Sequence, residues 1–280
     1  MKAVQAGYAL AQCVQCNFVW DPEGGLKPTV VYEENYYHNE NFKGGYANYS
    51  EAMQVNAITF RRRLQEASRK QRKVGALLDV GCALGDCLKQ AVDLGWPDPK
   101  GLEVSRFAVE SAKKKNLTVF QGSLLSHPFA PGSFDVILMQ DVIEHVPDPV
   151  AHLKEAYALL KPGGMIMLTT PDVGGLWSQI LGGRWYHYKP GEHLVYFSRS
   201  TMSLALANAG FGQIETESTS NYLSVGYVLN RLQYYHPKLF SWVATAAKHT
   251  SVDRLALWLR IGELEAWAWK PNPARHLRAA

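Results

Sequence analysis

The chain has 280 residues, enough for one large domain with additions, and 47% of them are hydrophobic, which is ordinary for a globular protein. A net charge of +4 is too small to indicate a nucleic-acid-binding protein, so no nucleic-acid partner is expected. The sequence starts without the apolar stretch of a signal peptide and contains no run near the roughly 20 apolar residues that cross a bilayer. Its four cysteines do not resemble a disulfide framework, so we expect a cytoplasmic protein.

The first 50 residues are expected to form a separate N-terminal segment. Cys13 and Cys16 have the spacing of a zinc knuckle, but a structural zinc site needs four ligands, so we expect reduced thiols. Tyrosines concentrate in residues 32–49, where Tyr36 and Tyr37 are adjacent. This stretch is predicted either to form an aromatic lid over a ligand or to pack in the core.

A helix from about Ser50 to Lys70 is predicted from the helical spacing of its apolar residues. The end of this helix is strongly basic, because it contains Arg61-Arg62-Arg63 and the cluster at 69–73. We interpret these bases as a solvated face, with contact to an anionic partner or a membrane surface as the alternative.

From residue 76 onward the sequence alternates between strand and helix patterns, which is typical of a doubly wound parallel sheet with helices on both faces. The predicted strands are residues 76–80, 101–104, 117–121, 135–139, 165–169, 213–219 and 264–269. The predicted helices are residues 86–94, a segment capped by Ser105, a segment that starts at Asp148-Pro149, and residues 200–208.

Residues 221–261 are apolar with scattered bases and are predicted to form a helical insert before the last strand. This insert is expected to bind a lipophilic substrate, to meet a dimer partner, or to complete the core. The expected organisation is an N-terminal segment 1–50, a core 51–220, an insert 221–262, and a last strand and tail 263–280.

Small residues follow the first predicted strand at every second position, in a turn where the backbone can approach a ligand closely. Asp79 ends that strand, and Gly81, Ala83 and Gly85 follow it. The dinucleotide-binding fingerprint spaces its glycines differently, which argues against a nicotinamide cofactor. An alanine at position 83 is tolerable if its backbone angles are ordinary.

Two further blocks follow in order, residues 134–146 and 159–164. Together with residues 77–86 they resemble the motifs of class I S-adenosylmethionine (SAM) methyltransferases. Residues 192–198, followed by a helix and Ala209-Gly210-Phe211, resemble the branch that includes the ubiquinone-pathway O-methyltransferases. The resemblance implies a seven-stranded, mostly parallel Rossmann-like sheet, SAM as the cofactor, and Cys13-x-x-Cys16 as the remnant of a zinc ribbon.

The same resemblance implies where the cofactor binds. Glu103 would accept hydrogen bonds from the ribose hydroxyls, and Ser123 stands where the family often has an acid that meets the adenine amino group. The implied cofactor residues are Asp79, Gly81, Cys82, Ala83 and Gly85 in the turn, Glu103 and Val104 after the second strand, Ser123 and Leu124 after the third, Gln140 and Asp141 after the fourth, and Tyr36 in the lid.

His145 is the leading candidate for a catalytic base, His193 is the second, and Glu144 accompanies them. The alternative is that Glu144 and His145 form a hydrogen-bonded pair that only shapes the cofactor pocket. Asp141-x-x-Glu144-His145, with His193 downstream, is also similar to the metal-binding set of small-RNA 2′-O-methyltransferases, which would imply Mg²⁺ or another divalent ion. Asp141 stands where that family carries Glu, which puts one ligand in doubt.

The expected function is therefore SAM-dependent methyl transfer by in-line displacement to an oxygen of a small or lipophilic acceptor. The alternatives are N-methylation of a small amine or a lipid head group, a nicotinamide-dependent oxidoreductase, and a SAM-binding module without catalysis. No Asn/Asp-Pro-Pro-Tyr/Phe motif follows the fourth strand, which argues against nucleobase N-methylation. The sequence leaves peripheral membrane contact and the oligomeric state open.

Overall fold

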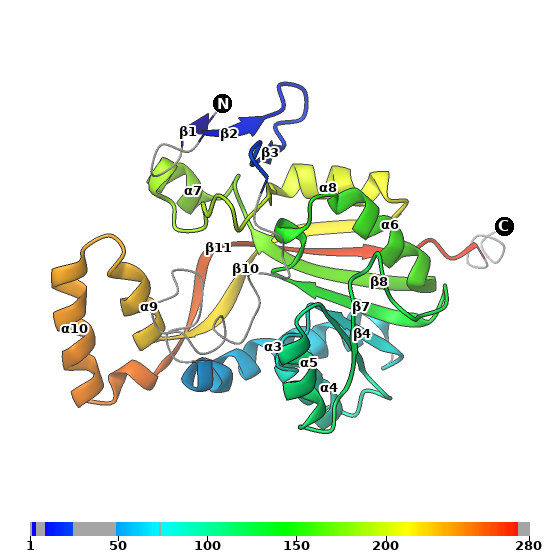
Figure 1. The fold of residues 1–280 in the computed structure, drawn as a ribbon, viewed down its shortest axis with the longest axis horizontal. Coiled ribbons are helices and arrows are strands. Elements are labelled where there is room, and N and C mark those ends of the chain that lie inside the picture. Colours follow the sequence, from blue (N-terminus) through cyan, green and yellow to red (C-terminus); the bar gives the residue numbers. More distant parts are fainter. Residues whose placement is uncertain (1, 4–8, 25–48, 73, 274–280) are drawn as a thin grey trace.

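The computed structural model describes residues 2–3, 9–24, 49–72 and 74–273 (Figure 1). A large sheet contains β4 (Leu77–Val80), β5 (Lys100–Glu103), β6 (Thr118–Gln121), β7 (Phe134–Gln140), β8 (Leu160–Pro171), β10 (Ile214–Ser224) and β11 (Ala256–Trp269). Its strand order is β10-β11-β8-β7-β4-β5-β6, and only β11 runs antiparallel to its neighbours. The predicted seven-stranded, mostly parallel sheet is confirmed.

Helices cover both faces of this sheet. They are α3 (Tyr49–Gln71), α4 (Asp86–Asp93), α5 (Arg106–Lys113), α6 (Pro149–Leu159), α7 (Leu176–Leu181), α8 (Arg199–Asn208), α9 (Val225–Leu232) and α10 (Pro237–His249), with the short 3₁₀ turns η2 (Ile143–His145), η3 (Gly182–Arg184) and η4 (Val252–Arg254). Two of the predicted helix starts are confirmed by their caps. Ser105 accepts a hydrogen bond from the Ala108 N–H, and Asp148 accepts one from the Ala151 N–H.

Strand side chains alternate between two cores, as the pleat of a strand requires. Ile137 and Met139 of β7 pack in a cluster with residues of α6 and α8. Val136 and Leu138 of the same strand point the other way and pack with residues of α3 and α4. Figure 1 shows these two helical layers on opposite sides of the sheet. β5 and β7 flank β4, so the direction of the connections reverses between β4 and β7, and this reversal is where open α/β sheets bind ligands.

The last two strands are longer than predicted. β10 continues to Ser224 and β11 starts at Ala256, whereas the sequence predicted residues 221–261 to be helical throughout. Residues 256–259 of β11 pair with β10 alone, beyond the end of β8, and they are largely exposed. Their apolar run therefore lacks the alternation that identifies a strand. α9, α10 and η4 form the insert, and no helix in the described ranges has the length and hydropathy to span a bilayer.

A second, antiparallel sheet joins the N-terminal segment to the middle of the chain, and the sequence did not predict it. Its strands are β1 (Lys2–Ala3), β2 (Ala9–Gln12), β3 (Val19–Trp20) and β9 (Val195–Tyr196). Leu10 and Val19 pack in one buried cluster with Trp185 and Tyr196. The Asp21 N–H donates to the Leu194 carbonyl at 2.8 Å, and Asp21 Oδ2 accepts from the Gly191 N–H at 2.9 Å. The loop at 189–194 is thus fixed against the N-terminal segment.

Candidate functional site

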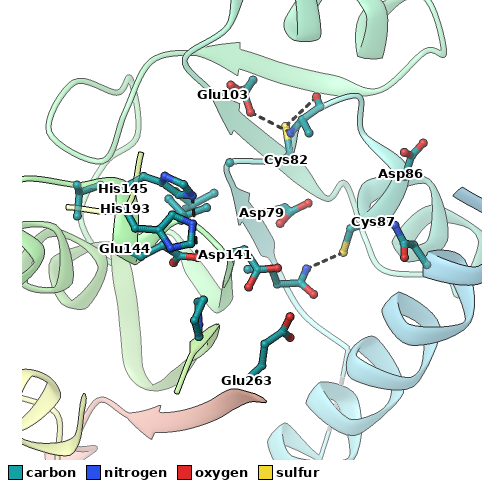
Figure 2. Close-up of a pocket in the computed structure, with 18 of the residues that line it drawn as sticks. Asp79, Cys82, Asp86, Cys87, Glu103, Asp141, Glu144, His145, His193 and Glu263 are labelled. Atoms are coloured by element: carbon teal, nitrogen blue, oxygen red, sulfur yellow. Dashed lines mark hydrogen bonds and ion pairs between the residues drawn. The ribbon is translucent and has the colours of Figure 1, made fainter. Parts of the chain in front are cut away.

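A cavity of about 610 Å³ opens at the carboxyl ends of β4, β5, β6 and β7. One end is lined by the turn after β4 and the loops after β5 and β6. The other end is lined by residues of the loop at 186–193 and of the insert. Figure 2 shows Asp79, Cys82 and Glu103 on one side, and Glu144, His145 and His193 on the other. A cavity of this size accommodates a cofactor together with a small acceptor.

The turn after β4 alternates between ordinary and left-handed backbone. Gly81, Ala83 and Gly85 have φ values of +70°, +47° and +82°. A Cβ on Gly81 would lie 2.4 Å from Val142 Cγ2, so only glycine fits there. Ala83 does not meet the condition of ordinary backbone angles, because its methyl group is held in the left-handed region, where an L-residue is strained.

Glu103 ends β5 with its carboxylate fixed by the backbone. Its Oε2 accepts from the Ala83 N–H and its Oε1 from the Ser105 N–H, both at 2.9 Å. Burial raises the pKa of Glu103, while the N–H groups of Ser105 and Ala83 oppose the shift. Each carboxylate oxygen retains a second acceptor site, so the group can receive further hydrogen bonds from a diol in the cavity.

Asp79 lies deeper, with only 2% of its surface exposed. Burial and then the charge of Glu103 raise the pKa of Asp79 to about 7, while a hydrogen bond with the Cys87 thiol opposes the shift. Gln140 Nε2 donates to Cys87 Sγ at 3.4 Å. The carboxyl of Asp79 is thus connected through Cys87 to Gln140 at the end of β7.

The remaining predicted cofactor residues divide into two groups. Cys82, Val104, Ser123, Leu124, Gln140 and Asp141 line the cavity together with Asp79, Gly81, Ala83 and Glu103. Gly85 does not line it, because it packs beside Leu117, where an added Cβ would lie 2.4 Å from Cδ1. Tyr36 and Tyr37 lie outside the described residues.

His145 has a defined tautomer when its ring is neutral. Its Nδ1 lies 2.9 Å from the Glu192 carbonyl oxygen, which can only accept, so Nδ1 carries the proton and Nε2 keeps its lone pair. Burial lowers the pKa of His145, although the Glu192 carbonyl acts in the opposite direction. The ring is therefore kept neutral, with a basic nitrogen in the cavity wall.

His193 and Glu144 complete this cluster. The His145 and His193 rings meet edge to face with their centroids 4.8 Å apart. His193 Nδ1 is buried and has no hydrogen-bond partner among the described residues, and burial followed by the neighbouring His145 lowers the pKa of His193 well below its usual value. Glu144 Oε2 accepts a hydrogen bond from Thr170 Oγ1 at 2.9 Å. Burial and then the charge of Asp141 raise the pKa of Glu144. The predicted direct pair is loose, since Glu144 Oε1 lies 4.0 Å from His145 Nε2.

One atom from each of Glu144, His145 and His193 lies within 4.8 Å of the others. Two neutral imidazoles and a carboxylate are a suitable donor set for a divalent ion, and the Nδ1–H of His145 on a carbonyl is the usual support for a ligating histidine. Asp141 is not part of this group. Its Oδ1 accepts instead from Thr169 Oγ1 at 3.3 Å. Within the described residues, Cys13 and Cys16 belong to no such group and are free thiols.

The interpretation of Arg63 as part of a solvated face is wrong. Its side chain is 4% exposed, and its guanidinium donates to Gln140 Oε1 and to Asn221 Oδ1, both at 2.8 Å. The charge is balanced by Glu263 and Glu265, at 3.9 and 3.7 Å. Burial and then the charge of Asp141 raise the pKa of Glu263 to about 7, although Arg63 opposes this.

One feature of the sequence is a sign of this cluster. Glu263, Glu265 and Trp267 are alternate residues of β11, so two acids share the face of an otherwise apolar strand. Such acids need a cation when they are buried.

The end of the cavity beside the insert combines aromatic rings with cations, and the sequence did not predict this arrangement. Arg231 lies 4.2 Å from the Tyr186 ring centroid and 4.8 Å from that of Tyr227. Lys189 pairs with Glu192 at 3.3 Å. Burial lowers the pKa of His187 to about 3, so this ring is a neutral part of the wall.

A profile of the methyltransferase domain matches residues 50–216 of the chain. The demethylmenaquinone methyltransferase of Lactococcus lactis is 35% identical over 101 residues, which are 33% of this chain and 40% of that protein. The ubiquinone biosynthesis O-methyltransferase of Ralstonia nicotianae is 33% identical over 101 residues, which are 34% of this chain and 42% of that protein. The matched region thus spans less than half the length of these relatives.

Solved structures agree on the fold. A SAM-dependent methyltransferase of Thermotoga maritima, described as a possible histamine N-methyltransferase, aligns with a TM-score of 0.55 and 19% identity over 82% of this chain and 97% of that one. A SAM-dependent methyltransferase of Archaeoglobus fulgidus aligns with a TM-score of 0.52 and 18% identity over 76% of this chain and 94% of that one.

Proposed function

The chain belongs to the methyltransferase-domain family, whose cofactor is SAM, and we propose that it transfers the methyl group of SAM to an oxygen of a small, lipophilic acceptor. Membership of this family removes the nicotinamide-dependent alternative. Two relatives are named for methyl transfer in ubiquinone biosynthesis and to demethylmenaquinone, which supports a lipophilic acceptor.

The residues at the cofactor end suit SAM. The Gly81 position leaves no room for a side chain, so the backbone itself forms the cavity wall, and Glu103 is held at the edge with free acceptor capacity for the two ribose hydroxyls. When bound, SAM supplies a methyl group on a positively charged sulfur. The task left to the protein is to hold the acceptor in line with that methyl group and to remove its proton.

The tautomer of His145 is the observation that carries transfer to oxygen. The Glu192 carbonyl fixes the proton on Nδ1, which leaves Nε2 to take the proton of an acceptor hydroxyl. The low pKa of His145 keeps that nitrogen unprotonated at neutral pH. Tyr186 and Tyr227 line the other end of the cavity and would contact the body of the acceptor.

Turnover and cofactor binding of a His145→Gln variant test this proposal. Formation of S-adenosylhomocysteine is measured with catechol-type phenols and with primary amines as acceptors. The variant should lose about 10²–10⁴-fold in kcat, as expected for removal of a general base, and should bind SAM as before. His127→Gln is the matched control, because His127 lies outside the cavity and pairs with Glu155.

Two outcomes would contradict this proposal. Turnover with amines but not with phenols would indicate transfer to nitrogen. A chain that binds SAM and forms no S-adenosylhomocysteine with any acceptor would be a binding module without catalysis.

A divalent ion at Glu144, His145 and His193 is the second candidate arrangement, and the buried, unpartnered Nδ1 of His193 favours it. Such an ion would lower the pKa of an acceptor hydroxyl. Dialysis against EDTA, followed by metal analysis and activity assays with and without added Mg²⁺, Mn²⁺ or Zn²⁺, distinguishes the two roles of His145. Full activity in the chelator, with no metal retained, excludes the ion.

A further inference from the structure

The net charge of the chain is concentrated in the insert. Residues 225–262 carry five basic side chains against one acid, Asp253, which gives +4. The five are Arg231, Lys238, Lys248, Arg254 and Arg260. The rest of the chain contains 24 basic and 24 acidic residues and is therefore neutral. Uneven charge of this kind indicates contact with an anionic partner.

α10 carries exposed apolar side chains as well as exposed basic ones. Its inner residues Ala244 and Ala247 pack with Leu229 of α9. On the opposite side, Trp242 is 72% exposed and Leu239 is 56% exposed, and their spacing of three residues puts them on one helical face. Lys238 and Lys248 are exposed near the two ends of the same helix.

The exposed apolar surface extends from α10 into the adjoining chain. η4 packs against both α9 and α10, and Val252 of η4 and the following Leu255 are exposed. Leu257 and Trp258 at the start of β11 are exposed too. Figure 1 shows α10 at the outer end of the molecule, away from the helices that cover the sheet. Among the described residues, Arg62 of α3 lies over the Trp258 ring, 4.5 Å from its centroid, and adds a further cation beside this exposed surface.

We propose that the insert docks on the surface of a bilayer that contains anionic lipids. Tryptophan and leucine beside lysines are the composition of helices that lie in the membrane interface, where Trp242 and Leu239 would enter the head-group boundary. The basic residues would contact the lipid phosphates. A second copy of the chain is a poorer occupant, because a symmetric contact would bring two basic surfaces together.

Docking in this way would bring the end of the cavity beside the insert, where we propose that the acceptor binds, to the bilayer. Tyr227 and Arg231 of α9 line the cavity, and Ile261 on β11 does so as well. A lipophilic acceptor could then enter from the membrane. This last point rests on the proposed function, whereas the docking itself does not depend on it.

Co-sedimentation of the full chain with vesicles tests the proposal. Vesicles of phosphatidylcholine alone are compared with mixed phosphatidylcholine–phosphatidylglycerol vesicles, at low and at high salt. We expect binding to the mixed vesicles, weaker binding in high salt because the charges are screened, and little binding to phosphatidylcholine alone. Tryptophan emission of the bound protein should shift to shorter wavelength.

Paired variants assign the binding to the insert. Lys238→Glu with Lys248→Glu should lower the partition coefficient more than about tenfold, since each charge near an anionic surface contributes about fivefold. Lys113→Glu with Lys114→Glu, at the exposed end of α5, makes the same charge change elsewhere and should lower it less. Leu239→Ser should weaken binding, whereas Leu204→Ser, which is 46% exposed on α8, should not. Circular dichroism and SAM binding confirm that each variant is folded.

The proposal is overturned if the mixed vesicles do not retain the protein, or if the α5 and α8 variants weaken binding as much as the α10 variants. It is also overturned if analytical ultracentrifugation finds a dimer that Leu239→Ser dissociates while vesicle binding is unchanged. SAM binding and turnover of a soluble acceptor are measured on the same samples, so a failure of the proposed function is seen separately.

Discussion

Ala83 is the residue at which the backbone of the turn after β4 is strained. Its φ of +47° costs an L-residue roughly 1–2 kcal/mol, and glycine avoids this cost but loses more entropy on folding. Ala83→Gly should therefore raise the free energy of unfolding by about 0.5–1 kcal/mol, as measured by urea denaturation without SAM.

The control for this substitution is Ala91→Gly, in the buried side of α4. An α-helical alanine has ordinary backbone angles, so the control should be destabilised by about 1 kcal/mol or more. If Ala83→Gly is destabilised to the same extent, the left-handed backbone at position 83 is not costly.

The buried carboxyl of Asp79 should make stability depend on pH. Its pKa is raised from 3.8 to about 7 in the folded chain, so the folded state binds a proton more tightly than the unfolded state. The free energy of unfolding should then fall as the pH rises from about 4 to about 7, by at most about 1.4 kcal/mol per pH unit for this group, and should level off above that range.

Asp79→Asn should reduce the slope of the free energy of unfolding against pH, measured by urea denaturation without SAM, while Glu263, whose pKa is also raised to about 7, keeps its own contribution. Glu110→Gln, at an exposed position of α5, should leave the slope unchanged. If the free energy of unfolding of Asp79→Asn depends on pH as steeply as that of the parent protein, the buried carboxyl does not hold the extra proton.

At the scale of elements, the N-terminal segment holds the loop at 189–194, which contains His193. Asp21 Oδ2 accepts from the Gly191 N–H, two residues before His193 in the sequence. Asp21→Ala leaves that N–H without its acceptor, which costs roughly 1–3 kcal/mol when the group is buried. We expect kcat to fall about tenfold while the Kd for SAM changes little, because the loop lines the end of the cavity away from Glu103.

Steady-state kinetics and calorimetry with SAM measure the two quantities. Gln12→Ala on β2 is the control, since among the described residues its side chain bonds to Asn17 alone, at the surface. Equal losses of SAM affinity and kcat in Asp21→Ala would contradict a role confined to the loop.

Elements whose ends have local chemical causes were predicted well. α5 and α6 begin where Ser105 and Asp148 cap them, and α8 was placed to within one residue at its start. The start of β11 was not predicted, because residues 256–259 are exposed and follow no alternating pattern. The small N-terminal sheet was missed because β3 is only two residues long and pairs with β9, which lies far away in the sequence.

At the scale of the whole molecule, the position of the turn after β4 and of Glu103 at the cavity was predictable, whereas the acid cluster around Arg63 was not. The turn after β4 and Glu103 belong to motifs with fixed spacing, so one sequence suffices to find them. Arg63 and Glu263 are 200 residues apart, and they meet because α3 packs against β10, whose neighbour in the sheet is β11. A basic run at a helix end gives no sign of which of its members turns inward.

Because Cys82 and Cys87 are buried, their reaction with an alkylating reagent can report opening of the turn after β4. Burial raises the pKa of both thiols well above the ordinary value, so neither forms a reactive thiolate while it is buried in the folded chain. Backbone N–H groups of Cys16 and Gln15 lower the pKa of Cys13. An alkylating reagent should thus modify Cys13 at once, and Cys87 only during transient opening of the turn after β4.

Peptide mass spectrometry over time would resolve the two rates, and saturating SAM should slow the second one alone. Fast alkylation of Cys87 that SAM leaves unchanged would contradict this picture. The alkylation rate of Cys87 thereby reports how often the turn after β4 opens, without any label having to be introduced.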